Sequence, residues 1–240
     1  MKSRWQKAQV SEESYRARRV KVRNYEKTQT CKRTMGTDFH EGFDFFEGKK
    51  ILEVGCGAFG MIHYLDVVSF KVGLDPLCSN YRNIIRQTPS TAHLISGVSE
   101  KLPFKDNMFD VLLCLNVLDH VIDPQVSVEE MARVLRAGGT LFLNVNVFNL
   151  VPKIFRRALG VFDRPHPHHF NSAEVTSLLK QVGFNIDSGS KVELNRFPRP
   201  NKFDAHAIKV AIAMALGIRQ FCERCTLSVD KMDKLMDGQQ

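Results

Sequence analysis

Residues 51–60 of this 240-residue chain read ILEVGCGAFG, an apolar run followed by three glycines spaced as G-x-G-x-x-G. Glycines at such a turn let the backbone come close to a bound nucleoside. Asp75 follows Gly55 by 20 residues, where a carboxylate can accept hydrogen bonds from ribose hydroxyls. The pattern predicts a strand, turn and helix that bind a nucleoside. The turn alone does not choose between a nicotinamide dinucleotide and another adenosine cofactor.

Short apolar runs and helical patterns alternate after this turn. Strands are expected at 51–54, 71–74, 92–95, 111–115, 140–145, 184–186 and 207–213. The alanines of the last run suit a helix equally well. Helices are expected around 61–65, around 81–85, from Asp123-Pro124 to Gly138-Gly139, and after Asn171, which forms a capping-box pair with Glu174. The alternation predicts an α/β fold built on a parallel sheet.

The net charge of +8 is unevenly distributed along the chain. Residues 1–33 hold 11 basic and 3 acidic side chains, residues 34–150 hold 9 and 14, and residues 151–240 hold 14 and 9. The basic character therefore belongs to the two flanks, and the middle is acidic. No apolar run is long enough to cross a membrane, and the N-terminus lacks the apolar region of a secretory signal.

Six cysteines are scattered over a chain long enough for a full core. This favours reduced thiols and a cytoplasmic location over a disulfide framework. Cys114 lies within an apolar run and is expected in the core. The pair Cys222-x-x-Cys225 has the spacing of a zinc or redox motif. The sequence contains only one such pair, so two thiols on a C-terminal helix are the better explanation.

Glu53, two residues before the first glycine, bears on the choice of cofactor. A carboxylate there would repel a pyrophosphate, but it would pair with the ammonium group of a cofactor that carries an amino acid. Two further stretches support this choice. They are residues 100–110, which lead into the strand expected at 111–115, and residues 135–141, which lead into the strand expected at 140–145.

With these stretches the sequence resembles the class I S-adenosylmethionine-dependent methyltransferases, in particular those of methyltransferase type 11. Four blocks match in order and spacing, at residues 52–57, 73–75, 102–110 and 135–139. The resemblance implies a Rossmann-like, doubly wound sheet of seven strands, mostly parallel with an antiparallel last strand. We expect a basic helical N-terminal arm at 1–47, a methyltransferase core at 48–215 and a C-terminal helical tail at 216–240.

The resemblance also implies S-adenosyl-L-methionine as the cofactor, S-adenosyl-L-homocysteine as the product, and a site across the carboxyl ends of the first, second and fourth strands. By this resemblance Glu53, Gly55 and Gly57 surround the methionyl part of the cofactor, and Asn116 lies close to its end. Asp75 holds the ribose hydroxyls, and Val98 and Ser99 flank the adenine. Cys56 and Pro76 are also expected to contact the cofactor. Two positions depart from the family. Phe59 stands where a third glycine is usual, with Gly60 one place later, and Val98 stands where an acidic residue often lies beside the adenine.

Histidines after two of the expected strands are candidates for acid–base chemistry at the acceptor. His120 follows the fourth strand on the side where the sulfonium is expected; its alternative role is to cap or pack the helix near Asp123. His168 and His169 belong to the run RPHPHHF at 164–170, which either lines the acceptor site or forms a proline-stiffened entry to the next helix. A metal site is not favoured there, because no cysteine, aspartate or glutamate ligand motif accompanies the histidines.

The sequence therefore predicts an enzyme that transfers a methyl group in line to an oxygen or carbon of a small molecule, lipid precursor or saccharide. The Asn/Asp-Pro-Pro-aromatic clamp of base amino-methyltransferases is missing from 116–121. The basic arm, in which Trp5, Tyr15 and Tyr25 interleave with arginines, is either a lid that favours an anionic acceptor or an RNA-binding element. An RNA methyltransferase and a non-catalytic binding protein are the alternatives, and the oligomeric state is not predicted.

Overall fold

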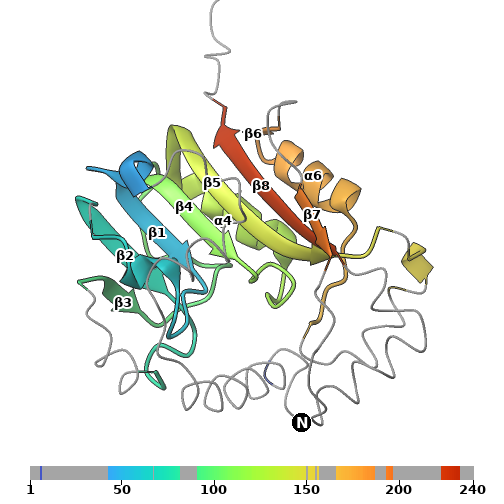
Figure 1. Ribbon diagram of the computed structural model, residues 1–240, viewed down its shortest axis with the longest axis horizontal. Helices are drawn as coiled ribbons and strands as arrows, with labels where there is room; N and C mark the ends of the chain where they lie inside the picture. Colours follow the sequence, from blue (N-terminus) through green and yellow to red (C-terminus); the bar gives the residue numbers. More distant parts are fainter. Residues whose placement is uncertain are drawn as a thin grey trace, which may run out of the picture.

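A single sheet of eight strands runs through the described part of the chain (Figure 1). The computed structural model describes residues 6, 43–66, 68–81, 91–149, 151–154, 156, 166–186, 193–196 and 223–232. The strands are β1 (Lys50–Val54), β2 (Phe70–Leu74), β3 (His93–Ile95), β4 (Phe109–Leu115), β5 (Leu135–Val147), β6 (Phe184–Asn185), β7 (Glu193–Arg196) and β8 (Glu223–Lys231). Their order is β3-β2-β1-β4-β5-β8-β6, and β7 also pairs with β8. β1 to β5 are parallel to their neighbours among themselves, whereas β8 is antiparallel to β5, β6 and β7.

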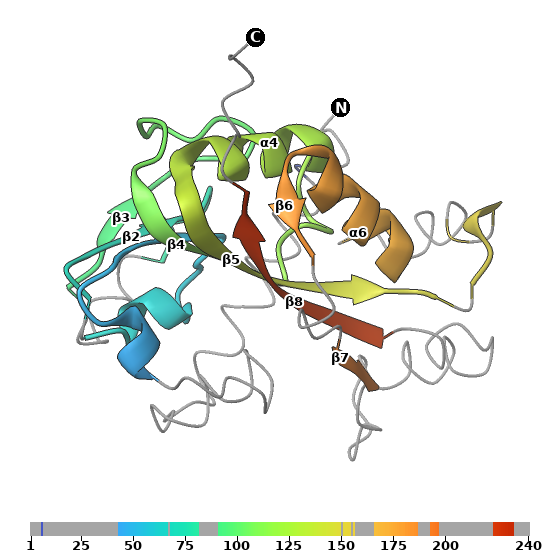
Figure 2. The same ribbon diagram turned by 90° about the horizontal axis from the view of Figure 1, so that it is seen from above.

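Helices cover both faces of the sheet. α4 (Pro124–Val134) and α6 (Ser172–Gln181) lie side by side on one face (Figure 2). The short 3₁₀ helices η1 (Phe43–Phe46) and η2 (Met61–His63) pack on the other. In the described part of the chain, no helix has the length and apolarity that crossing a bilayer requires.

The central strands β1 and β4 are buried on both faces. Leu52 and Leu112 pack in the cluster that includes the inner side of α4. Their neighbours Ile51 and Val111 pack on the opposite side with Phe46 of η1. Successive side chains of a strand point to opposite faces, so a strand covered on both sides needs apolar residues at every position. This explains the continuous apolar runs from which these strands were predicted.

The predicted starts of the two α-helices are confirmed. Asp123 accepts a hydrogen bond from the backbone N–H of Gln125 at 2.9 Å, and Pro124 is the first helical residue of α4. Asn171 and Glu174 form a reciprocal capping box at the start of α6. Both caps satisfy N–H groups that have no partner within the helix. They fix the ends of two loops that lie beside the site described below.

The helix that begins after Asp123 ends earlier than predicted. α4 stops at Val134, and Leu135 already has extended backbone (φ −78°, ψ 132°) as the first residue of β5. Gly138 and Gly139, expected to end the helix, lie instead within β5, where its pairing with β4 is irregular. A Cβ on Gly139 would lie 2.9 Å from the carbonyl oxygen of Asp110. The close approach of the two strands therefore accounts for this glycine.

The helix predicted around 61–65 is a single 3₁₀ turn, Met61–His63. The buried ammonium group of Lys71 donates a hydrogen bond to the carbonyl oxygen of Leu65 at 2.6 Å, so the chain is already tied to β2 two residues after the turn. The helix predicted around 81–85 lies outside the described residues beyond Tyr81.

The C-terminal helical tail predicted at 216–240 is wrong where the structure describes it, because Glu223–Lys231 form β8. The run ERCTLSVDK places an apolar residue at every second position, which is the period of a strand. Of the eight described strands, β1 to β6 correspond to predicted strands, whereas β7 and β8 were not predicted, and Cys225 lies on a strand. Cys222, the strand predicted at 207–213 and the N-terminal arm, apart from Gln6 and residues 43–47, lie outside the described residues.

Candidate functional site

An open depression lies at the carboxyl ends of β1, β2 and β4. Its volume is about 60 Å³. Open α/β sheets bind their ligands at this edge, beyond the carboxyl ends of the strands. The lining includes seven of the residues proposed from the sequence: Gly55, Asp75, Pro76, Val98, Ser99, Asn116 and His120. Glu53, Cys56, Gly57, His168 and His169 are not among the described residues that line it.

The turn after β1 requires glycine at Gly55. This residue has a φ of +71°, a conformation that side chains rarely adopt, and a Cβ there would overlap the Val117 side chain. Its N–H continues the sheet by donating to the carbonyl of Leu74 at 2.6 Å. Val117 therefore closes over the turn, and this contact keeps the depression narrow.

Asp75 ties the turn to the end of β2. Its Oδ2 accepts a hydrogen bond from the N–H of Gly57 at 2.9 Å, and its Oδ1 accepts one from the N–H of Leu77 at 2.8 Å. The residue is 7% exposed and lines the depression. A carboxylate has about four acceptor positions, so Asp75 can hold the turn and still accept hydrogen bonds from a ligand's hydroxyl groups.

Glu53 lies behind the turn and not in the depression. Its Oε1 and Oε2 accept hydrogen bonds from the N–H groups of Met61 (3.2 Å) and Ile62 (2.7 Å). A Cβ on Gly60 would lie 2.7 Å from Oε2. The displaced third glycine of the sequence is therefore explained by the space that the Glu53 carboxylate takes. This carboxylate positions the turn, and its ion pair with the ammonium group of the cofactor stays a prediction.

His63, which the sequence did not single out, also supports the turn. Its side chain is fully buried, and Nε2 lies 3.2 Å from the carbonyl oxygen of Gly57. Burial lowers the pKa of His63, with a smaller contribution from the nearby Lys71 ammonium, against the opposing effect of the hydrogen bond. The imidazole is thereby held neutral beneath the glycines.

The described thiols near the site are not exposed nucleophiles. Cys114 is fully buried within β4, as expected, and burial raises the pKa of its thiol. Cys56 and Cys78 are hydrogen-bonded to each other, and this bond, together with burial, raises the pKa of Cys56. All three are free cysteines in the interior. A deprotonated thiolate is the reactive form, so the raised pKa values make Cys114 and Cys56 poor nucleophiles. The hydrogen bond with Cys56 lowers the pKa of Cys78, which is buried.

Glu100 brings a carboxylate to the side of the depression where the adenine is expected. Val98, Ser99 and Glu100 all belong to the lining. Glu100 Oε1 accepts hydrogen bonds from the N–H groups of Ile122 at 2.6 Å and Asp123 at 3.2 Å. Although Val98 replaces the acidic residue that is common in the family, Glu100 puts a carboxylate two residues further along the same loop.

The loop after β4 begins with a strained residue. Asn116 has a φ of +60°, which is uncommon outside glycine. Its N–H donates to the carbonyl of Asn144 at 2.7 Å, and its Oδ1 accepts from Asn146 Nδ2 at 3.2 Å. Such strain persists only where surrounding contacts hold it, and it is concentrated at functional sites.

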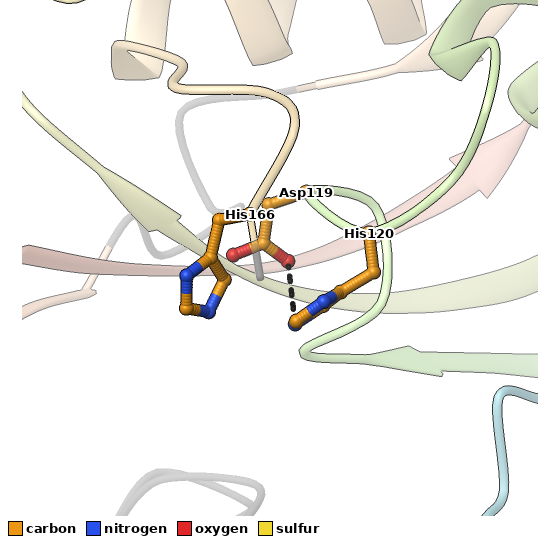
Figure 3. Close-up of side chains that lie close together, drawn as sticks. All are labelled: Asp119, His120 and His166. Carbon is orange, nitrogen blue, oxygen red and sulfur yellow. Dashed lines mark ion pairs between the residues drawn. The ribbon is translucent and has the colours of Figure 1, made fainter. Parts of the chain in front are cut away.

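Asp119, His120 and His166 meet beside this loop (Figure 3). His120 Nε2 lies 3.8 Å from Asp119 Oδ1, and the Asp119 side chain is only 2% exposed. The rings of His120 and His166 have centroids 4.5 Å apart. No carboxylate ligand motif accompanies the histidine run in the sequence, but folding brings Asp119 to His166. The two residues belong to different segments, so no local pattern pointed to the group.

His168 and His169 have contacts outside the depression. His168 Nε2 lies 3.0 Å from the carbonyl oxygen of Val121 and 3.2 Å from that of Ile122. Since both partners are acceptors, this nitrogen carries the hydrogen. The His169 ring packs against Phe148, with centroids 5.3 Å apart. His168 therefore ties the segment before α6 to the loop after β4, which is a positioning role.

Comparison with known proteins agrees with this geometry. Residues 52–143 match a family model described as a methyltransferase domain. The ubiquinone biosynthesis O-methyltransferase of Hydrogenovibrio crunogenus is 26% identical over 173 residues, which cover 66% of this chain and 71% of that protein. Other curated relatives, several with the same name, are matched over 42–53% of their length, so the chain spans about half of each.

Solved structures share the fold. A putative methyltransferase from Bacillus halodurans has a TM-score of 0.63 at 16% identity, covering 82% of this chain and 100% of that chain. A phosphoethanolamine N-methyltransferase from Haemonchus contortus, solved with phosphomonomethylethanolamine and S-adenosylhomocysteine, has a TM-score of 0.60 at 15% identity, covering 86% and 52%. The likeness to these structures shows the fold, and the sequence match from β1 to β5 shows a methyltransferase domain at residues 52–143.

Proposed function

We propose that the depression binds S-adenosylmethionine and that the methyl group goes to an oxygen of a small acceptor. Asp75 would accept hydrogen bonds from the ribose hydroxyls, and Val98 and Ser99 would contact the adenine. Asn116 would lie near the methionyl end. The support is that all four residues line one depression at the strand ends where this fold binds ligands.

The cofactor must displace side chains as it enters. Ligand pockets of drug-sized molecules hold roughly 300–1,000 Å³, and the volume of the depression is about 60 Å³. Val117, which packs against Gly55, narrows the depression. We therefore propose that the Val117 side chain turns aside when the cofactor binds.

The observation that carries the oxygen assignment is the position of His120. His120 lines the depression, and its ring lies beside the buried carboxylate of Asp119. A hydroxyl acceptor must lose its proton as the new bond forms, and a neutral imidazole can take that proton. The Asp119 charge would stabilise the imidazolium that results. The O-methyltransferase name of the Hydrogenovibrio relative supports the same class of acceptor.

The rest of the proposed mechanism is positioning. S-adenosylmethionine supplies an electrophilic methyl group on a sulfonium, and transfer is an in-line displacement. The protein has to hold the acceptor oxygen opposite the sulfur, and this alignment supplies much of the rate enhancement. The loop after β4 and the segment tied to it by His168 would form that side of the site.

The test measures methyl transfer from labelled S-adenosylmethionine to a panel of small phenols, carboxylates, sugars and amines, and to RNA. We expect transfer to a hydroxyl-bearing acceptor, and a fall in kcat of about 10²–10⁴-fold in H120Q, the range of a lost acid–base group. Cofactor affinity, measured by calorimetry, is expected to change much less. The matched control H93Q alters an exposed histidine on β3 and should keep wild-type kcat.

Other outcomes would overturn the proposal in separable ways. Binding of a nicotinamide dinucleotide in preference to S-adenosylmethionine would remove the cofactor assignment. Transfer to RNA that disappears when residues 1–33 are deleted would favour the RNA enzyme instead. Cofactor binding without transfer to any acceptor of the panel would favour a non-catalytic binding protein.

A further inference from the structure

Three potential metal ligands converge at the acceptor side of the depression. One ligand atom each from Asp119, His120 and His166 lies within 4.8 Å of the others. Two of the residues come from the loop after β4 and the third from the segment before α6, so the group exists only in the folded chain. Figure 3 shows the Asp119 carboxylate between the two imidazole rings.

An unsatisfied oxygen points to a missing partner. Asp119 Oδ1 is buried and has no hydrogen-bond partner among the described residues. Its distance to His120 Nε2, 3.8 Å, is too long for a hydrogen bond. A buried carboxylate oxygen without a partner is costly unless a cation or donor reaches it.

The second oxygen of Asp119 is held in place. Oδ2 accepts a hydrogen bond from Asn146 Nδ2 at 3.1 Å, and the backbone carbonyl of Asp119 accepts one from the N–H of His168 at 3.2 Å. Outer contacts of this kind orient the ligands of metal sites. The carboxylate is therefore fixed with one oxygen directed toward the histidines.

We propose that Asp119, His120 and His166 bind a divalent transition metal of the zinc class. Two imidazoles and one carboxylate suit Zn²⁺, Co²⁺ or Fe²⁺, whereas Mg²⁺ and Ca²⁺ prefer sites made of oxygens alone. Bonds of about 2.0–2.1 Å at tetrahedral angles place ligand atoms roughly 3.3 Å apart. The three atoms must move somewhat closer, and His166, which is only half-buried, can make that movement. Three protein ligands leave a fourth position open, as in catalytic zinc sites.

The role of the metal rests on the proposed cofactor and hydroxyl acceptor, and it changes the role proposed for His120. His120 belongs to the lining, so the open position faces the acceptor. A hydroxyl oxygen bound there becomes more acidic. Its proton passes to solvent, the oxygen forms the bond to the methyl group, and the sulfonium–methyl bond breaks to leave the thioether. With metal bound, His120 acts as a ligand, and the metal replaces it as the group that makes the oxygen nucleophilic.

The test uses tag-free full-length protein dialysed against a chelator and then titrated with Co²⁺. Visible absorption and calorimetry report binding, and Zn²⁺ is the competitor. We expect one equivalent of Co²⁺ to bind and Zn²⁺ to displace it. D119N and H166Q should each lose affinity by at least about tenfold, and H93Q should not. Since Asp119 is buried, circular dichroism and thermal unfolding check that D119N is folded, and H166Q carries the result if it is not.

Each result decides for or against the site, separately from the proposed function. Undiminished Co²⁺ binding in H166Q, or a strong thiolate charge-transfer band, places the metal elsewhere and overturns the proposal. The absence of binding also overturns it; in that case the chelator-treated protein still transfers methyl groups if His120 acts directly as the base. Transfer that stops on chelation and returns with Zn²⁺ or Co²⁺, in wild type but not in H166Q, supports the metal role. S-adenosylmethionine binding without metal is measured in the same protein, so a failure of the cofactor assignment is seen independently.

Discussion

The turn after β1 and the loop after β4 face the same depression, but they differ in how their buried polar groups are paired. In the turn, Glu53, His63 and Asp75 all contact backbone groups of residues 57–62. Beside the loop, Asp119 Oδ1 and Asn146 Oδ1 are buried without a hydrogen-bond partner among the described residues. The turn is therefore complete by itself, while the loop keeps polar groups available for a ligand. A substitution in the turn is expected to cost folding stability as well as binding.

Gly55→Ala, in the turn, is expected to cause the largest loss of the free energy of unfolding among these variants. The new Cβ would sit at a φ of +71° and overlap Val117. Backbone strain of roughly 1–2 kcal/mol and overpacking of roughly 1–3 kcal/mol should together lower the free energy of unfolding by about 2–5 kcal/mol. Urea denaturation measures the loss, and calorimetry with S-adenosylmethionine should show weaker binding.

Two further variants separate the causes of the Gly55 effect. Gly48 has a similar φ of +67° with open space around it, so Gly48→Ala should show the strain alone, about 1–2 kcal/mol. Adding Val117→Ala to Gly55→Ala removes the overlap and should recover part of the loss. If Gly48→Ala cost as much as Gly55→Ala, the contact with Val117 would have no part in shaping the turn.

Glu53→Gln should have the next largest effect. The buried carboxylate accepts two backbone N–H groups, and the amide can accept at only one of its two ends. Hydrogen bonds to charged groups contribute about 1.5–3 kcal/mol each, so we expect the free energy of unfolding to fall by roughly that amount. The control is Glu129→Gln on the exposed side of α4, expected to change stability by less than about 0.5 kcal/mol. Equal losses in the two variants would contradict the role given to Glu53.

His63 makes the stability of the turn depend on pH, and this is the smallest expected effect. Burial lowers the pKa of the folded His63, so below about pH 6.5 the unfolded chain binds a proton that the folded chain excludes. The contribution of His63 to the free energy of unfolding is therefore complete above that pH. It falls by at most about 1.4 kcal/mol for each pH unit below it. Urea midpoints between pH 7.5 and 5.5 should vary less in H63Q than in wild type. In H93Q the urea midpoint should change with pH as it does in wild type. If it changed in the same way in H63Q as well, His63 would not be the source of the pH dependence.

The sequence was informative where structure depends on neighbours in the chain. The glycine turn, Asp75 at the end of β2 and the caps at Asp123 and Asn171 were predicted, because each depends on residues only a few positions apart or on a known spacing. Gly138-Gly139 misled the prediction, because two glycines mark a helix end and an irregular strand equally well.

The acceptor side could not be predicted because it depends on contacts between distant segments. Nothing local to Asp119 indicates that His166 lies beside it, and the link through His168 depends on the placement of α6. The support that Glu53 gives to the turn could not be predicted for a similar reason. Its carboxylate meets N–H groups of η2, and their position is set by the path of the turn.

β8 lies inside the sheet although it is the last of the described strands in the sequence. Among the described strands, β6 and β7 pair only with β8. β8 also covers one edge of β5 along residues 140–147. During synthesis, at roughly 5–20 residues per second, β5 emerges several seconds before β8. Its edge is an open template for other chains in that interval. We therefore expect the nascent chain to be prone to aggregation after Val147 has left the ribosome and before Lys231 has.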